Sequence, residues 1–182
     1  MLDGRVVTWG VDGVDTVQVA AGLSVAELTQ AEERYGFSFP PDLRELLSTG
    51  LPTGGLFPNW RSDEGNLRAQ MESPVRGLLF DVEHSSLWLE EWGTKPGNIG
   101  LAVALAERQL GAVPLLIPVF GHRYLPSEPN KPGNPVLSVH QSDIIRYGRN
   151  LTEYFGVEFG ARPLPEGLPD RAAIPFWGQL VS

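Results

Sequence analysis

The apolar residues of segment 24–36 recur three or four positions apart, as they do along one face of an amphipathic helix. This stripe consists of Val25, Leu28, Ala31 and Tyr35. Ser24 and Glu27 have the spacing of a capping box, in which each side chain bonds a free backbone N–H at the helix start. Gly36 is a natural helix end. We therefore predict a helix that begins after Ser24 and ends at Gly36.

Three further segments have a helical pattern; they are 41–50, 98–110 and 151–159. Pro41 suits the first turn of the first segment, where its missing N–H leaves no hydrogen bond unmade. The second segment is apolar on most sides, which predicts a well buried helix. The third starts behind another capping box, formed by Asn150 and Glu153.

Short apolar runs rich in β-branched residues predict strands. Two such runs are 114–120 and 135–140, which we expect to be neighbours joined by the turn-rich segment 127–134. Residues 1–20 are expected to form an N-terminal β-hairpin, because two β-prone runs flank Gly10 and Gly13. The last residues, 174–181, form an apolar patch that we expect to dock back on the domain.

The middle of the chain gives weaker signals. Segment 51–66 has no helical or alternating period and is read as a long loop with Phe57 and Trp60 tucked in. Ser73–Pro74 is expected to open a short helix or a turn. Segments 78–83 and 87–92 are ambiguous, because their aromatic residues favour strands while their leucines and glutamates favour helix.

Charge is distributed unevenly along the 182 residues. The formal net charge is −8, and residues 1–95 carry all of the excess, with 15 acidic and 7 basic side chains. A protein that holds phosphate backbones needs the opposite sign, so we expect no direct contact with nucleic acid. The acidic half is either an ordinary solubilising surface or a face matched to a basic partner.

Compartment signals are few. The chain has no cysteine, which excludes disulfides, thiolate metal sites and cysteine nucleophiles. Asp3 and Arg5 interrupt any signal-peptide pattern, and no uncharged run is long enough for a membrane span. We expect a cytoplasmic protein that does not associate with membranes.

The residue types that catalytic sites use are present, but they do not have the spacing of known catalytic motifs. A metal site drawn from Asp81, His84, His122 and His140 has no recognised ligand spacing. Ser138, Ser142 or Ser127 combined with a histidine and Asp143 supplies triad residue types, yet no G-x-S-x-G elbow is present. The sequence also contains no P-loop and no dinucleotide-binding motif.

Two pairs of residues have an open interpretation. Asp81 and Glu83 share a face if their segment is a strand, as paired catalytic carboxylates do, although a solvated face explains them as well. Trp88 and Trp92 share a face if theirs is a helix, which is typical both of a core and of a protein-binding surface.

Segment 121–148 contains two histidines, three serines, arginines, tyrosines and an aspartate, as active sites do. The alternative is that these polar groups close a sheet and order a loop. We favour the structural role, and we predict that His122 and Arg123 are partly buried and hydrogen-bonded, because the guanidinium group has five donors with which to tie backbone carbonyls together.

The stretch LTQAEERYGFSFPPDLRELLSTGLPTG resembles the entry segment of the SUKH superfamily, in particular its Smi/Knr-like branch. The matching positions are Ala31, Glu32, Gly36, Phe39, Pro40, Pro41, Asp42, Leu43 and Gly50. Blocks farther along, GLLFDVEHSSLWLEEWGTKP, PLLIPVFGHRYLP and GNPVLSVHQSDIIRYGRNLTEYFGVEF, resemble downstream blocks of bacterial members. The resemblance covers most of residues 20–180.

This resemblance implies a single α+β domain over 1–182, with a mainly antiparallel or mixed sheet and flanking helices. The N-terminal hairpin, 1–20, lies outside the recognised part, and residues 160–182 form a proline-rich C-terminal extension. The resemblance also implies a non-enzymatic role without cofactor or metal: an immunity protein that binds and neutralises a cognate toxin domain, basic in charge and plausibly a nuclease. The alternative is an intracellular regulatory scaffold.

From the acidic half we select candidate residues for contact with such a partner. They are Asp63, Glu64, Asp81, Glu83, Glu90, Glu91 and Trp92. We select no catalytic residues and no metal ligands.

Overall fold

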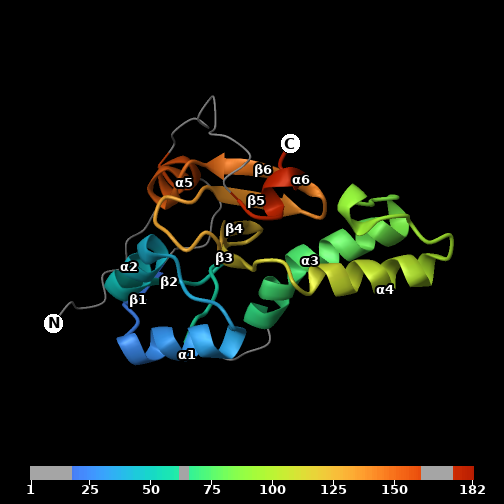
Figure 1. Cartoon of the computed structure of the whole chain (residues 1–182). Helices are drawn as coiled ribbons and strands as arrows, with labels where there is room; N and C mark the ends of the chain where they lie inside the picture. Colours follow the sequence, from blue (N-terminus) through green and yellow to red (C-terminus); the bar gives the residue numbers. More distant parts are fainter. Residues whose placement is uncertain (1–17, 62–65, 161–173) are drawn as a thin grey trace.

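Two antiparallel sheets and the helices around them make up the described part of this computed structural model, residues 18–61, 66–160 and 174–182 (Figure 1). The smaller sheet pairs β1 (Gln18–Ala21) with β2 (Gly50–Thr53). The larger sheet has the order β3-β4-β5-β6, with β3 (Leu116–Phe120), β4 (Arg123–Pro126), β5 (Val136–His140) and β6 (Asp143–Gly148). This confirms the expected α+β class with antiparallel sheets.

Six α-helices and one short 3-10 helix accompany these sheets in the described residues. They are α1 (Val25–Tyr35), α2 (Pro41–Thr49), α3 (Asn66–His84), the short 3-10 helix η1 (Glu90–Trp92), α4 (Ile99–Leu110), α5 (Leu151–Glu158) and α6 (Trp177–Leu180). The helices expected over 24–36, 41–50, 98–110 and 151–159 are therefore confirmed.

Both ends of α1 are as expected. Ser24 and Glu27 form the full capping box, and Gly36 ends the helix with φ 72° in the left-handed region. A hydrogen bond from Arg61 and two from Ser24 lower the pKa of Glu27 to about 2. The stripe is narrower than expected, because Val25 is 74% exposed and only Leu28 and Ala31 are buried.

The segment around Pro74 differs most from expectation. Instead of opening a short helix or a turn, Pro74 lies in the interior of the long helix α3. This helix continues through 78–83, so that ambiguous segment is helical. Proline has no N–H to donate to the carbonyl four residues earlier, that of Gln70. The Tyr124 hydroxyl donates to the Gln70 carbonyl instead, at 3.1 Å, so a contact from the sheet satisfies the acceptor that Pro74 leaves open.

The large sheet has two strands more than the sequence predicts, β4 and β6. The runs 114–120 and 135–140 are strands, but they are not neighbours, because β4 lies between them and pairs with both. The turn-rich segment 127–134 joins β4 to β5. Strand β4 could not be recognised from the sequence, because the strand is short, follows a glycine-containing turn and ends in a proline.

Two hydrophobic clusters form the core, one on each face of the large sheet. Ile117, Leu125 and Val136 belong to the cluster that contains side chains from α1, α2 and α5. Their strand neighbours Leu116 and Leu137 belong to the cluster that contains side chains from α4 and α6. Successive strand residues point to opposite faces, so the strands must be apolar on both sides.

The C-terminal residues dock as expected. Ile174, Trp177 and Val181 are buried, and the Trp177 indole donates to the Pro114 carbonyl at 2.6 Å. Val181 forms a parallel bridge to Ile144 of the edge strand β6, and Ser182 N donates to the Ile144 carbonyl. The C-terminus therefore covers part of a sheet edge.

The expected N-terminal hairpin is only partly within the described residues. Its last residues, 18–20, belong to β1, which pairs with β2 in the segment that the sequence suggested was a loop. The run at 6–9 and residues 161–173 of the C-terminal extension lie outside the described residues.

Candidate functional site: a projecting helical arm

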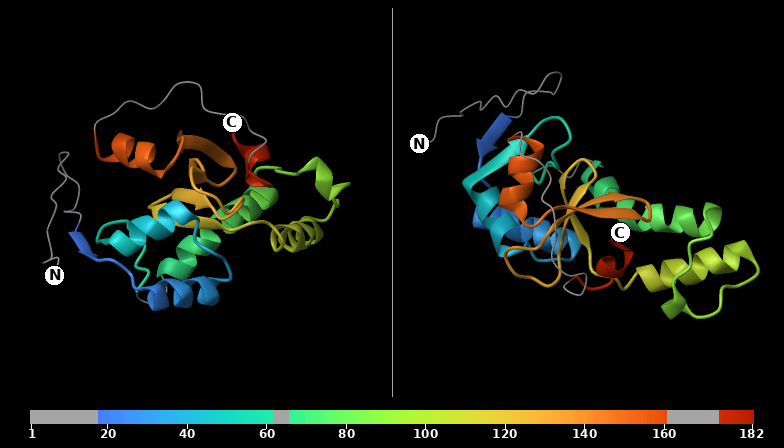
Figure 2. Two further views of the ribbon diagram at one scale, coloured as in Figure 1. Left: turned by 60° about the vertical axis from the view of Figure 1, so that its left-hand side comes forward. Right: turned by 90° about the horizontal axis from the view of Figure 1, so that it is seen from above.

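The second half of α3, η1 and α4 form a structure that we call the helical arm, residues 78–110. Figure 1 and the right panel of Figure 2 show α3 and α4 side by side and extending away from the four-stranded sheet. The 3-10 helix η1 lies in the connection between them. The arm therefore presents more surface to a partner than an element packed flat on the sheet.

Two tryptophans pack in the connection between α3 and α4, as part of the cluster that the arm shares with the sheet and the C-terminal residues. Trp92 is 6% exposed and lies edge-on to Trp88, with ring centroids 5.3 Å apart. The Trp88 indole donates to the Gly93 carbonyl at 2.7 Å, and Lys95 lies over the Trp88 ring. The two tryptophans thus fix the connection between the helices, although they do not share a helix face as one reading of the sequence proposed.

The buried members of the acidic candidate set have structural positions. Asp81 is 4% exposed and accepts hydrogen bonds from Ser142 N at 2.9 Å and Ser142 Oγ at 2.6 Å. It lies on α3 and not on a strand, so it does not share a face with the exposed Glu83 as a carboxylate pair. With Trp92 also buried, neither Asp81 nor Trp92 offers its side chain to a partner.

Among the described residues, the exposed members of the set lie on the arm. Glu83, Glu90 and Glu91 are exposed, and Glu83 lies beside His84 with 3.8 Å between carboxylate and ring nitrogen. Glu91 accepts a hydrogen bond from Gln179 Nε2 at 3.0 Å, which links the arm to the C-terminal segment. Asp63 and Glu64 lie outside the described residues.

Exposed apolar side chains accompany these glutamates, and the sequence analysis missed them. Phe80, Ile99 and Leu101 are 47%, 48% and 64% exposed. The prediction that α4 is well buried is therefore wrong in part, because only Ala102, Ala106 and Leu110 of this helix are fully buried. The four-residue spacing of these three residues is the signal that leaves Ile99 and Leu101 on the open face.

The polar segment 121–148 forms a cluster centred on Arg123, whose side chain is 11% exposed. The guanidinium lies 3.9 Å over the Tyr147 ring, donates to Ser138 Oγ at 3.0 Å and lies 3.6 Å from the Glu158 carboxylate. Burial raises the pKa of Tyr154, and the nearby Glu158 charge adds to this. The cluster joins β4, β5 and β6 to α5.

The cluster does not have the arrangement of a nucleophile and its base. Ser138 accepts from an arginine, which cannot take up a proton. His122 contacts Arg123 and is exposed, so the expected partial burial holds for Arg123 alone. Partial loss of hydration around the ring, followed by the Arg123 and His140 charges, lowers the pKa of His122. Within the described residues, no three histidine or acidic side chains are grouped to hold a metal ion.

Replacing Glu158 with glutamine is expected to lower the free energy of unfolding by about 1–2 kcal/mol, because Arg123 then keeps a buried charge without a counter-charge. Urea denaturation followed by circular dichroism measures the change. Glu33→Gln, at an exposed position of α1, is the control and is expected to stay within about 0.5 kcal/mol of the original protein. Equal stability of the two variants contradicts a structural role for the Arg123–Glu158 pair.

Comparisons with known proteins give no relative for this chain: no protein-family model matches, and neither curated proteins nor solved structures give a match. Among the described residues, no helix combines the length and the apolar character needed to cross a membrane.

Proposed function

We propose that this chain is a non-enzymatic protein-binding domain that acts as an immunity protein, and that its helical arm enters and blocks the active site of a cognate toxin. The observation that carries the proposal is the exposed combination of Glu83, Glu90 and Glu91 with Phe80, Ile99 and Leu101 on one projecting structure. The resemblance of the sequence to SUKH immunity proteins points the same way.

The shape and charge of the arm fit this task. Active sites are concave, so a projecting element reaches into them more easily than a flat face does. Between residues 78 and 110 the chain has five acidic and two basic side chains. A toxin that cleaves nucleic acid has an electropositive groove for the phosphates, and glutamates are able to occupy that groove in their place.

The apolar residues have a separate part in the mechanism. Charged contacts guide association and select the partner, while desolvated apolar contacts at the centre of an interface supply most of the affinity. Phe80 stacks on His84 at a centroid distance of 4.2 Å, so its ring is held in place before a partner arrives. An immunity protein of this type protects the cell that makes it, and we therefore propose that it acts in the cytoplasm.

Association with the partner is expected to depend on salt. Raising the ionic strength from about 0.05 M to about 0.3 M should slow association roughly tenfold, because ions screen the attraction between the acidic arm and a basic groove. Stopped-flow fluorescence over a salt series measures the rate constant. An association rate that does not change across the series rules out the electrostatic part of the mechanism.

The partner needed for the stopped-flow experiment is identified by affinity capture of the tagged protein from its native lysate, with mass spectrometry of the bound material. The activity of the recovered polypeptide is then measured with and without this protein. Stoichiometric inhibition supports the immunity function. An active, uninhibited partner instead supports the alternative, an intracellular regulatory scaffold that uses the same arm.

A further inference from the structure

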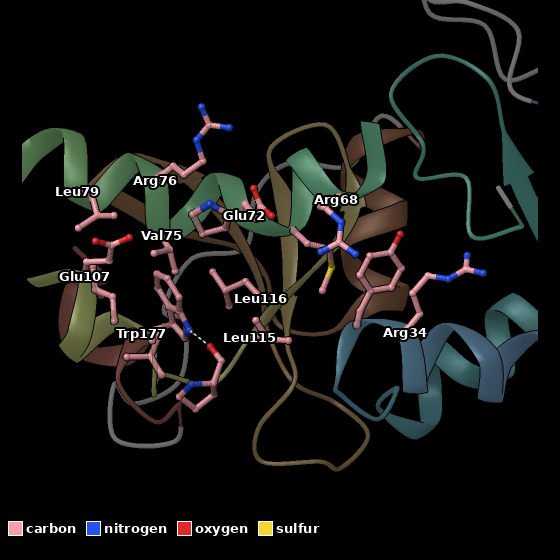
Figure 3. Close-up of a pocket in the computed structure, with 17 residues that line it drawn as sticks. Arg34, Arg68, Glu72, Val75, Arg76, Leu79, Glu107, Leu115, Leu116 and Trp177 are labelled. Atoms are coloured by element: carbon pink, nitrogen blue, oxygen red, sulfur yellow. Dashed lines mark hydrogen bonds between the residues drawn. The ribbon is translucent and has the colours of Figure 1, made fainter. Parts of the chain in front are cut away.

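A groove runs below α3 at the base of the arm, and we call it the base groove. Its volume is about 450 Å³, which lies within the usual range for small-molecule sites. Figure 3 shows α3 along one side of it, the C-terminal end of α1 at one end and Glu107 of α4 at the other. The base groove shares Leu79, Glu107 and Leu110 with the arm but none of the acidic or apolar residues assigned to partner contact.

The floor of the base groove is apolar and partly accessible. Tyr35, Val75, Leu79, Val113 and Leu115 are half-buried side chains that line it. Fully buried side chains support this floor from below, including Trp177, which is tied to the Pro114 carbonyl. The floor is therefore formed before any ligand binds, and apolar ligand surface gains free energy by covering it.

Charge is arranged asymmetrically around that floor. Arg68 lies at the α1 end, where its guanidinium is 5.7 Å from the centre of the Tyr35 ring, and Arg34 extends outward beyond Tyr35 (Figure 3). Glu107 lies at the opposite end, beside Leu79. Arg76 also lines the groove, but Figure 3 shows its side chain pointing away from the floor, so the positive charge nearest the floor is that of Arg68.

We propose that the base groove binds a small amphipathic carboxylate. Its acid group lies at the α1 end against Arg68, where a carboxylate accepts charge-assisted hydrogen bonds from a guanidinium group. Its hydrocarbon part lies on Val75, Val113 and Leu115. Arg68 and Leu79 are eleven positions apart on α3, about 16 Å at the helical rise, which leaves room for a medium-chain acyl group.

The charge pattern selects this ligand over others. A neutral hydrocarbon covers the floor but leaves the Arg68 end unused, and a cation is repelled from that end and attracted only by Glu72 and Glu107. An anion without an apolar part gains nothing from the floor. The site does not depend on the partner of the arm, so failure of the immunity proposal leaves it standing.

Octanoate and 1-octanol provide the test, because they share a chain and differ in charge. Each is titrated into the ¹⁵N-labelled full chain, and shifts of the indole N–H signals are followed by NMR. Saturable movement is expected for Trp177 under the groove, with Trp92, buried in the connection between α3 and α4, as the internal reference. Octanoate is expected to bind about fivefold more tightly than 1-octanol.

Two variants test whether Arg68 is the cause of the preference for octanoate over 1-octanol. Arg68→Gln is expected to weaken octanoate binding about fivefold and to leave 1-octanol binding unchanged. Lys131→Gln removes one positive charge at an exposed position outside the groove and is expected to change neither. Equal affinities for the two ligands, an Arg68→Gln variant that binds octanoate as well as the original chain, or no saturable shift at Trp177 overturns the proposal.

Discussion

Replacing Trp177 with alanine is expected to lower the free energy of unfolding by about 3–5 kcal/mol, the largest effect among the substitutions considered. Trp177 is 0% exposed and belongs to the cluster that α4, the sheet and the C-terminal residues share. The substitution leaves a cavity below the sheet and also removes the indole donor of the Pro114 carbonyl.

Urea denaturation followed by circular dichroism measures this loss without relying on tryptophan emission. Trp177→Phe keeps a large ring and loses the indole hydrogen bond, so we expect a smaller loss of about 1–2 kcal/mol. Glu33→Gln, at an exposed position of α1, is again the surface control. A loss below about 1 kcal/mol for Trp177→Ala shows that the C-terminal segment does not dock in solution as described.

Replacing Asp81 with alanine is expected to cost about 2–3 kcal/mol. Its buried carboxylate accepts from the backbone N–H and the hydroxyl of Ser142, at the turn between β5 and β6. Gly77 brings α3 so close to this turn that an added Cβ would lie 2.9 Å from Gln141 Cα. Without the carboxylate, the Ser142 N–H has no acceptor at this contact, and the base of the arm loses its tie to the sheet.

The contribution of Asp81 also has a characteristic pH dependence. Burial by itself raises the pKa of Asp81, but the hydrogen bonds from Ser142 and Ser85 outweigh it and hold the pKa below its ordinary value of 3.8. The stabilisation is therefore complete above pH 3.8 and is lost as the pH falls through the lowered pKa of the folded state.

A pH series of denaturation curves for the original chain and Asp81→Asn tests this dependence. The stability difference between the two proteins should be constant at neutral pH and should shrink toward zero in acid. Glu83→Gln, two positions farther along α3 and exposed, is expected to behave as the original chain does. A difference that grows as the pH falls contradicts the assigned direction of the Asp81 pKa.

Helices whose ends are set by capping residues next to them in the sequence could be predicted from the sequence alone. The capping box of Ser24 and Glu27 and the side chain of Asn150, which accepts from Glu153 N, mark helix starts that the structure confirms. The reciprocal bond of Glu153 goes to Arg149 N and not to Asn150, so the second box is a looser version of the first.

Elements that depend on distant contacts were not predictable in this way. The helix α3 continues through Pro74 because Tyr124, fifty residues farther along the chain, supplies a donor to Gln70. The same limit applies to the candidate site. Acidic composition directed attention to the first half of the chain, but only the packing of α3 against the β5–β6 turn separates the buried Asp81 from the exposed Glu83.

The central claim is that the helical arm binds the partner, and comparative affinity capture tests it most directly. The baits are the original chain, an arm variant with Glu83→Lys and Glu90→Lys, and a body variant with Glu33→Lys and Glu45→Lys on α1 and α2. All four glutamates are exposed, and both variants change the net charge equally. Glu91 is left in place because it accepts from Gln179.

Quantitative mass spectrometry of the bound material should show the partner retained by the original chain and the body variant, and reduced at least about tenfold with the arm variant. Leu101→Ser on the arm and Val25→Ser on α1 form a matched apolar pair, with the loss expected for Leu101 alone. A partner that both charge variants retain equally, or that only the body variant loses, contradicts binding by the arm.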